Sequence, residues 1–96
     1  MIAENITKDG VLTVVERAVK YRGEEKLEYV LYRTEKDGRD SYSIRAVRYK
    51  NGRCVCRAAA GDVSSVYKTA HGMFESISEG LVEPYLLCDV VYDLLP

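Results

Sequence analysis

The spacing of apolar residues changes once along this chain, at Gly61-Asp62, from every second residue to every third or fourth. Alternation with a period of two is typical of β-strands, whereas a period near 3.6 is typical of amphipathic helices. The change therefore predicts a chain whose strands all come first and whose helices follow. Because strands and helices do not alternate, a doubly wound sheet is excluded and an α+β fold is expected.

Turn-forming residues divide the first sixty positions into four segments. We expect strands at about 11–21, 27–35, 41–50 and 53–60. The dipeptide Asn51-Gly52 is the sequence that two-residue type I′ hairpins prefer. Short connections between successive strands predict a four-stranded antiparallel β-meander.

Two C-terminal helices are expected after the strands, at about 63–79 and 84–95. Gly80 is placed to end the first helix, and Pro84 suits the first position of the second, where its missing N–H costs nothing. The length of 96 residues is that of a single domain, so residues 1–96 are expected to fold as one unit.

A tight Asn-Gly loop would also set the register of the third and fourth strands. Residues whose numbers add to 103 would then face each other. One face would carry mostly small side chains, and the first helix is expected to pack on it: Val47, Tyr49, Cys54, Cys56, Ala58 and Ala60. The other face would carry Tyr42, Ile44, Arg48, Lys50, Arg53, Val55 and Arg57.

The formal net charge of −1 conceals a basic part joined to an acidic part. Thirteen of the fourteen Lys and Arg residues lie before Gly61, whereas six of the fifteen Asp and Glu residues lie after it. Such asymmetry bears on binding partners rather than on fold. The basic hairpin Arg39–Arg57 is a candidate nucleic-acid surface, because cations neutralise phosphates and an aromatic such as Tyr42 can stack on unpaired bases. The acidic isoelectric point near 5.8 favours an ordinary solvated face instead.

The last helix carries an outward strip of Tyr85, Asp89 and Asp93, which would meet water or the arginines of a second subunit. Apolar and tyrosine surface exceeds what one small core can hide. We therefore expect a non-enzymatic interaction or regulatory module that acts through a protein partner or as a homodimer, with nucleic-acid binding as the alternative. The candidate binding residues are Tyr42, Arg48, Arg53, Arg57, Tyr85, Asp89 and Asp93.

Cys54 and Cys56 form a C-x-C pair that would project to one side of a strand, where His71 and Cys88 are the remaining soft ligands. This makes a metal or small-molecule site near Cys54, Cys56 and His71 a second alternative. The spacing matches no zinc motif, so buried structural cysteines are favoured and no metal or cofactor is expected.

The sequence also shows neither a framed nucleophile nor a phosphate-binding glycine loop, so an enzyme is not expected. The odd cysteine count, the missing secretory signal and the absence of a membrane-length apolar run predict a cytoplasmic protein that does not enter membranes.

The segment from Val82 to Leu95 combines Val-x-Pro, Leu-x-Asp-Val-Val and an acidic-aliphatic ending. In this it resembles the C-terminus of a family of small uncharacterised bacterial proteins, a domain of unknown function. Cys88 and Tyr92 depart from that pattern, which has more polar residues there. The resemblance implies a four-stranded cytosolic fold and a bacterial origin, and it implies no catalytic residue.

Overall fold

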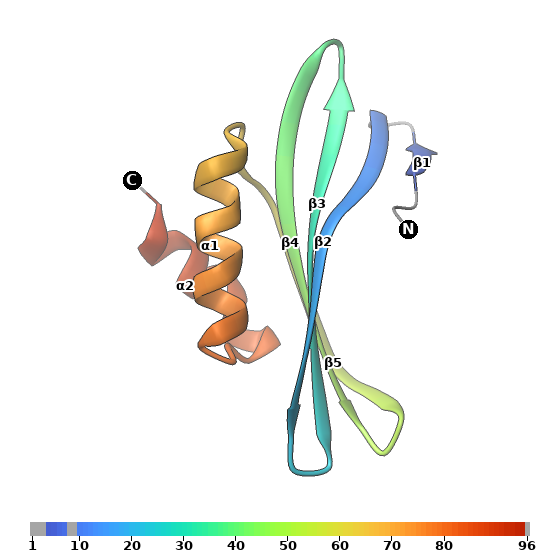
Figure 1. Ribbon diagram of the computed structural model, residues 1–96, viewed down its shortest axis with the longest axis vertical. Coiled ribbons are helices and arrows are strands. Elements are labelled where there is room, and N and C mark those ends of the chain that lie inside the picture. The colour runs from blue at the N-terminus through green and yellow to red at the C-terminus, as the bar shows by residue number, and fades with distance from the viewer. Residues whose placement is uncertain (1–3, 8–9, 96) are drawn as a thin grey trace.

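The computed structural model describes the backbone of residues 4–7 and 10–95 and the side chains of residues 11–95. One antiparallel sheet contains β1 (Glu4–Thr7), β2 (Gly10–Arg22), β3 (Glu25–Lys36), β4 (Arg39–Lys50) and β5 (Arg53–Ser64), in that order. After the sheet come α1 (Tyr67–Glu79), the 3-10 turn η1 (Pro84–Leu86) and α2 (Leu87–Leu94) (Figure 1). The predicted α+β fold, a four-stranded meander followed by two helices, is confirmed, and the short β1 adds a strand at its edge.

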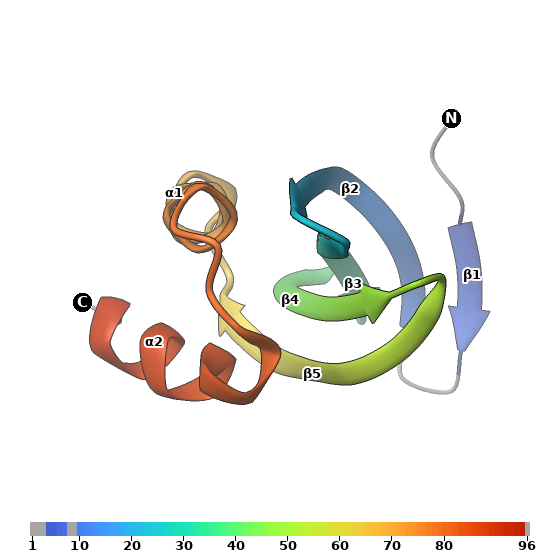
Figure 2. The ribbon, with the colours of Figure 1, turned by 90° about the horizontal axis from the view of Figure 1, so that it is seen from below.

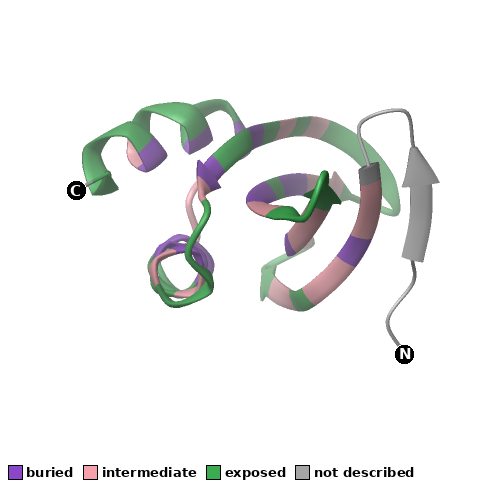
Figure 3. Ribbon diagram, turned by 90° about the horizontal axis from the view of Figure 1, so that it is seen from above, coloured by how far each residue is buried: buried purple, intermediate pink, exposed green. Residues whose placement is uncertain are grey.

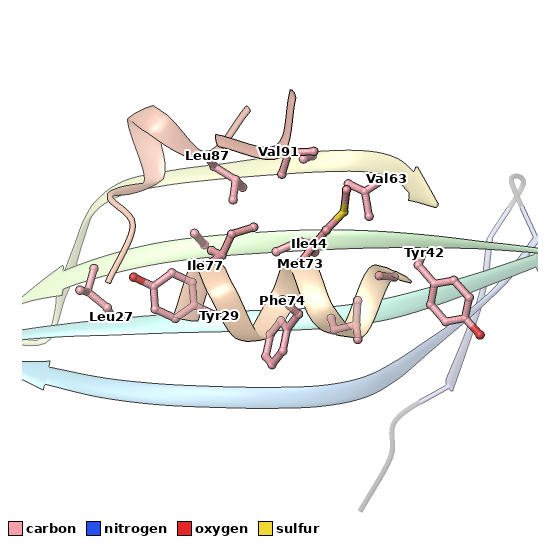
Figure 4. Close-up of a cluster of buried hydrophobic side chains, with 14 residues drawn as sticks. Leu27, Tyr29, Tyr42, Ile44, Val63, Met73, Phe74, Ile77, Leu87 and Val91 are labelled. Carbon is pink, nitrogen blue, oxygen red and sulfur yellow. The ribbon is translucent and has the colours of Figure 1, made fainter. Parts of the chain in front are cut away.

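Both helices pack on the same face of a strongly twisted sheet, as the view along the strands shows (Figure 2). Alternate residues of β3 and β4 point towards them, and these residues are almost fully buried. The core beneath the helices is formed by Leu27, Tyr29, Leu31, Tyr42, Ile44 and Ala46 of the sheet, with Met73, Phe74, Ile77, Leu87 and Val91 of the helices (Figure 4).

The register of β4 and β5 follows the prediction only beside the turn. Lys50 pairs with Arg53 and Tyr49 with Cys54, but Arg48 pairs with Cys56, so Val55 is an extra residue on β5. A bulge of this kind reverses the side to which every later residue points. The face that the helices cover is therefore the one with Ile44 and Ala46, and the expected packing of the first helix against Val47 and Tyr49 is wrong.

The turns themselves have the predicted geometry. Asn51 and Gly52 have φ angles of 52° and 78°, as a type I′ turn requires at its two central residues. Asp37 and Gly38, with φ angles of 54° and 74°, form the corresponding turn between β3 and β4.

The first helix begins at Tyr67, four residues later than the expected start at residue 63. Residues 61–64 instead continue β5 through an irregularity in which Asp62 adopts a φ angle of 51°. Two serines of β4 hold this conformation: the Asp62 N–H donates to the Ser43 hydroxyl oxygen over 3.1 Å, and the Ser41 hydroxyl donates to the Asp62 carboxylate over 2.8 Å. These cross-strand contacts extend the sheet beyond Gly61, so the change of period does not mark the start of the helix.

The C-terminal segment is tied to the sheet by a buried hydrogen bond. The Tyr29 hydroxyl of β3 donates to the backbone carbonyl of Val82 over 2.8 Å. This contact fixes the chain immediately before Pro84, where the predicted second helix begins as one 3-10 turn and continues as α2. None of the helices described is long and apolar enough to span a membrane.

Candidate binding surfaces

Four charged side chains form a closed network on the helix side of the sheet. Arg48 lies 3.1 Å from the carboxylate of Glu83 and 3.7 Å from that of Glu25, and Arg22 contacts the same two carboxylates. The hydrogen bonds that Arg22 donates to Glu83 and Glu25 raise the pKa of Arg22, and the bond that Glu25 accepts from Arg22 lowers the pKa of Glu25. Because Arg48 is already engaged in this network, its contribution is to hold Glu83 and the C-terminal segment in place.

Of the other residues expected on one basic face of the hairpin, two lie on the same side of the sheet as Arg48 and one does not. Tyr42 is buried beneath α1, where its ring meets that of Tyr67 edge-on at 5.8 Å between centroids. Arg53 is exposed at the turn and pairs with Lys50 on the helix side, whereas Arg57 is exposed on the opposite side. Tyr42, Arg48 and Arg53 therefore share one face as expected, but it is the face that the helices cover, and the bulge at Val55 moves Arg57 to the opposite face.

A different basic surface lies on the side of the sheet away from the helices. Residues that pair across antiparallel strands share a face, so the register assigns each paired side chain of β2 to β5 to one side or the other. We call the side opposite α1 and α2 the helix-free face. In the part of the chain whose side chains are described, its charged residues are two carboxylates and six cations. The carboxylates are Glu28 and Asp62, the second placed there by its contacts with Ser41 and Ser43, and the cations are Arg17, Lys26, Lys36, Arg39, Arg45 and Arg57.

Only part of this positive charge is neutralised within the described residues. Glu28 is buried and accepts a hydrogen bond from Nε of Arg17 over 2.7 Å. Arg45 and Arg57 are exposed, and neither forms an ion pair with any side chain in residues 11–95. Arginine without an intramolecular carboxylate is available for an external anion.

Two hollows lie along β4 and β5, and each has cations of the helix-free face in its lining. The larger, of about 840 Å³, lies beside the β3–β4 turn and the bulge at Asp62, and its lining combines the cations Lys36 and Arg39 with the acidic residues Asp37, Asp40 and Asp62. The smaller, of about 370 Å³, is lined by Arg45 and Arg57 with Ala58 and Ala59. Arg39 and Arg45 are six residues apart on one strand, which places the two hollows roughly 20 Å from each other.

The helices carry the opposite charge. From residue 65 onwards the described side chains include one lysine, Lys68, and five carboxylates. Tyr85, Asp89 and Asp93 are exposed on η1 and α2, as the sequence predicted, and Tyr92 beside them is 77% exposed. Only the side of α2 that faces β5 is buried (Figure 3). Neither Asp89 nor Asp93 forms an ion pair with Arg45 or Arg57.

His71 joins α1 to the sheet. Its Nε2 lies 3.0 Å from the carboxylate of Glu16 on β2, and its Nδ1 lies 3.3 Å from that of Glu75 on the same helix. Its ring also lies against that of Tyr67, with 5.4 Å between centroids. Both ring nitrogens therefore face carboxylates, and the contact with Glu16 connects α1 to β2.

The three cysteines do not converge. Cys54 pairs with Tyr49 on the helix-free face, whereas Cys56 pairs with Arg48 on the helix side, because Val55 bulges between them. Cys54 and Cys88 are exposed and Cys56 is partly exposed, so the expected burial beneath a helix is wrong. Within the described residues, no three His, Cys, Asp or Glu side chains are close enough to hold a metal ion together.

Comparison of the chain with models of protein families, with curated proteins and with solved structures finds no match in any of the three. The resemblance of residues 82–95 to a bacterial family therefore stays a prediction. In this structure the segment's Glu83 belongs to the charged network, and its Leu87 and Val91 belong to the core.

Proposed function

We propose that this protein is a non-enzymatic interaction module that binds nucleic acid on its helix-free face. The observation that carries the proposal is the segregation of charge: six cations and two carboxylates share that face, in a chain whose net charge is −1. A phosphate backbone is attracted to such a surface and repelled by the acidic helices, so the field of the molecule orients the ligand as well as attracting it.

The spacing of the cations favours an extended ligand. Lys36 and Arg39 stand at one hollow and Arg45 and Arg57 at the other, roughly 20 Å away along β4. A single phosphate would satisfy one hollow only, whereas a strand of several nucleotides reaches both. The acidic isoelectric point of the whole chain does not prevent such binding, because a phosphate backbone responds to the local charge of the face that it contacts.

Fluorescence anisotropy with labelled single-stranded and double-stranded oligonucleotides of mixed sequence tests the proposal. Binding is expected at low ionic strength, and log K should fall with log salt with a slope of about −3 for single strands if about four phosphates are neutralised. The variant Arg45→Glu/Arg57→Glu should bind at least tenfold more weakly and with a shallower slope, since it removes two phosphate contacts and adds two repulsive charges.

The matched control is Lys50→Glu/Lys68→Glu, which makes the same change in net charge at two exposed residues on the helix side. It should retain most of the affinity. A wild-type protein that binds neither oligonucleotide at low salt would rule the proposal out. So would a control variant that loses as much affinity as Arg45→Glu/Arg57→Glu, because general charge and not the helix-free face would then explain the binding.

A second candidate function is self-association through the outer side of α2. Tyr85, Leu86, Tyr92 and Leu94 are 68%, 40%, 77% and 39% exposed, a concentration of apolar surface that monomers seldom leave uncovered. The carboxylates of Asp89 and Asp93 lie on the same η1–α2 segment as these exposed apolar side chains. Their charge is complementary to the helix-free face of a second copy, which supports docking of the α2 strip on that face.

Sedimentation velocity at low salt tests this second candidate. Wild-type protein should associate, and Asp89→Lys/Asp93→Lys and Arg45→Glu/Arg57→Glu should each remain monomeric. A mixture of the two variants should associate again, because the exchanged charges are complementary. A wild-type protein that stays monomeric at every concentration and salt would exclude self-association.

A further inference from the structure

Three of the eight tyrosines lie on the helix-free face among its cations. Tyr21 on β2 is 75% exposed, and Tyr32 on β3 and Tyr49 on β4 are partly exposed. By contrast, Tyr29 and Tyr42 point to the other side and are buried in the core. The register therefore gives this face aromatic rings as well as positive charge.

The rings are arranged around the cations in a definite order. Tyr21, Lys26 and Tyr49 form one row across the sheet, and the Lys26 ammonium lies 4.5 Å from the centre of the Tyr49 ring. Tyr32 lies six residues along β3 from Lys26, roughly 20 Å away. The guanidinium groups of Arg17, Arg45 and Arg57 belong to the rows between. A ligand that contacts both Tyr21 and Tyr32 passes Arg17 on β2 and has Arg45 and Arg57 beside it on β4 and β5.

Since Lys26 already covers a face of Tyr49, the available stacking platforms are Tyr21 and Tyr32. Nucleobases stack on aromatic side chains only when the bases are unpaired, because a duplex buries their faces against one another. Phosphates between the stacked bases would meet the arginines. We infer that the nucleic acid bound on the helix-free face is single-stranded, with bases stacked on Tyr21 and Tyr32 and its backbone held by Arg45 and Arg57.

This inference rests on the proposed function, and its test separates the two. Affinities are measured for a single-stranded oligothymidine, a duplex of the same length and poly-glutamate, which has negative charge but no bases. The single strand should bind at least tenfold more tightly than either of the others. Tyr21→Leu/Tyr32→Leu should bind the single strand at least tenfold more weakly, while Tyr21→Phe/Tyr32→Phe keeps the rings and should stay within about twofold of wild type.

Tyr85→Leu/Tyr92→Leu is the matched control, because it removes two exposed rings from the helix side. It should leave binding unchanged. Circular dichroism of each variant shows whether it is folded, and the phenylalanine pair keeps the test valid if the leucine pair is destabilised.

Each remaining outcome is decisive. Equal affinity for single strand and duplex, with no effect of the leucine pair, would overturn the stacking inference and leave nucleic-acid binding intact. Poly-glutamate bound as tightly as the oligonucleotide would point to an acidic protein partner and overturn both. Failure of all three probes to bind at low salt would overturn both as well.

Discussion

Replacing Tyr29 by phenylalanine removes one hydroxyl from a side chain that is fully buried beneath the C-terminal segment. That hydroxyl donates to the Val82 carbonyl over 2.8 Å, and the substitution leaves the carbonyl without this partner. A hydrogen bond of this kind contributes about 1 kcal/mol to the free energy of unfolding. Tyr29→Phe should therefore be less stable by about 1 kcal/mol at neutral pH, and its Tm should be lower by roughly 4–8 °C for a domain of this size.

The same hydroxyl makes the difference depend on pH. Burial, and after it the Glu83 carboxylate, raises the pKa of Tyr29 from 10.0 to about 12. A group whose pKa is raised by folding contributes its full stability below the unfolded value, and the contribution is lost as the pH rises towards the folded value. Wild type should thus lose on the order of 1.4 kcal/mol relative to Tyr29→Phe by about pH 11. The two proteins should become equally stable near that pH, and above it the variant should be the more stable.

Urea unfolding followed by circular dichroism across this pH range measures the difference directly. Tyr92→Phe is the control, because the Tyr92 side chain is largely exposed. The free energy of unfolding of this variant should stay close to that of wild type at every pH. The reasoning is refuted if Tyr29→Phe is as stable as wild type at neutral pH, or if their difference does not narrow as the solution becomes alkaline.

Three further predictions concern the fold. Glu83→Gln should lower the free energy of unfolding by about 1–2 kcal/mol in urea titrations, because it removes the carboxylate that binds two arginines; a loss below a few tenths would show that the network is not stabilising. Gly52→Ala should lower the free energy of unfolding by about 1 kcal/mol, because Gly52 has a φ of 78°. Gly72→Ala should raise it by roughly 0.5–1 kcal/mol, because an added methyl group on α1 would meet open space. Changes of the same sign in the two variants would contradict the assigned geometries. Mild oxidation should form no disulfide between Cys54 and Cys56, as mass analysis of the tryptic peptide 54–57 would reveal, because the two thiols lie on opposite sides of the sheet.

The order of the elements could be predicted because it depends on local signals. The alternation of apolar residues, the Asn51-Gly52 turn and the position of Pro84 each act within a few residues, and each has the expected outcome. Exposure of Tyr85 and Asp89 on the last helix also follows from its period.

The faces of the sheet could not be predicted because they depend on bulges. One extra residue at Val55 sends Cys54 and Cys56 to opposite sides of the sheet. A second bulge, at Val15, likewise sends Val14 and Glu16 of β2 to opposite sides. The irregularity at Asp62 depends on serines twenty positions away in β4, which no local pattern reports. An error of one residue in register moves a whole strand to the wrong face.

For this reason the sequence does not predict that Arg17, Lys36, Arg45 and Tyr32 belong to one surface. Their types were visible in the sequence, but their convergence on one face was not. One usable signal was the alternation of side chains along β4. Because Arg39 and Arg45 are six residues apart, they share a face in any regular strand.

The central claim is that the helix-free face is the binding surface, and two natural thiols report on it without any substitution. Cys54 is exposed on that face, whereas Cys88 is exposed on α2, where its Sγ lies 3.8 Å from the backbone carbonyl of Ala59 in β5. The measurement is the rate at which each thiol is alkylated, followed by mass spectrometry, with and without a saturating single-stranded oligonucleotide at low salt. The account predicts that the oligonucleotide slows alkylation of Cys54 and leaves Cys88 unchanged. Protection of Cys88 alone, or of neither thiol, would contradict it.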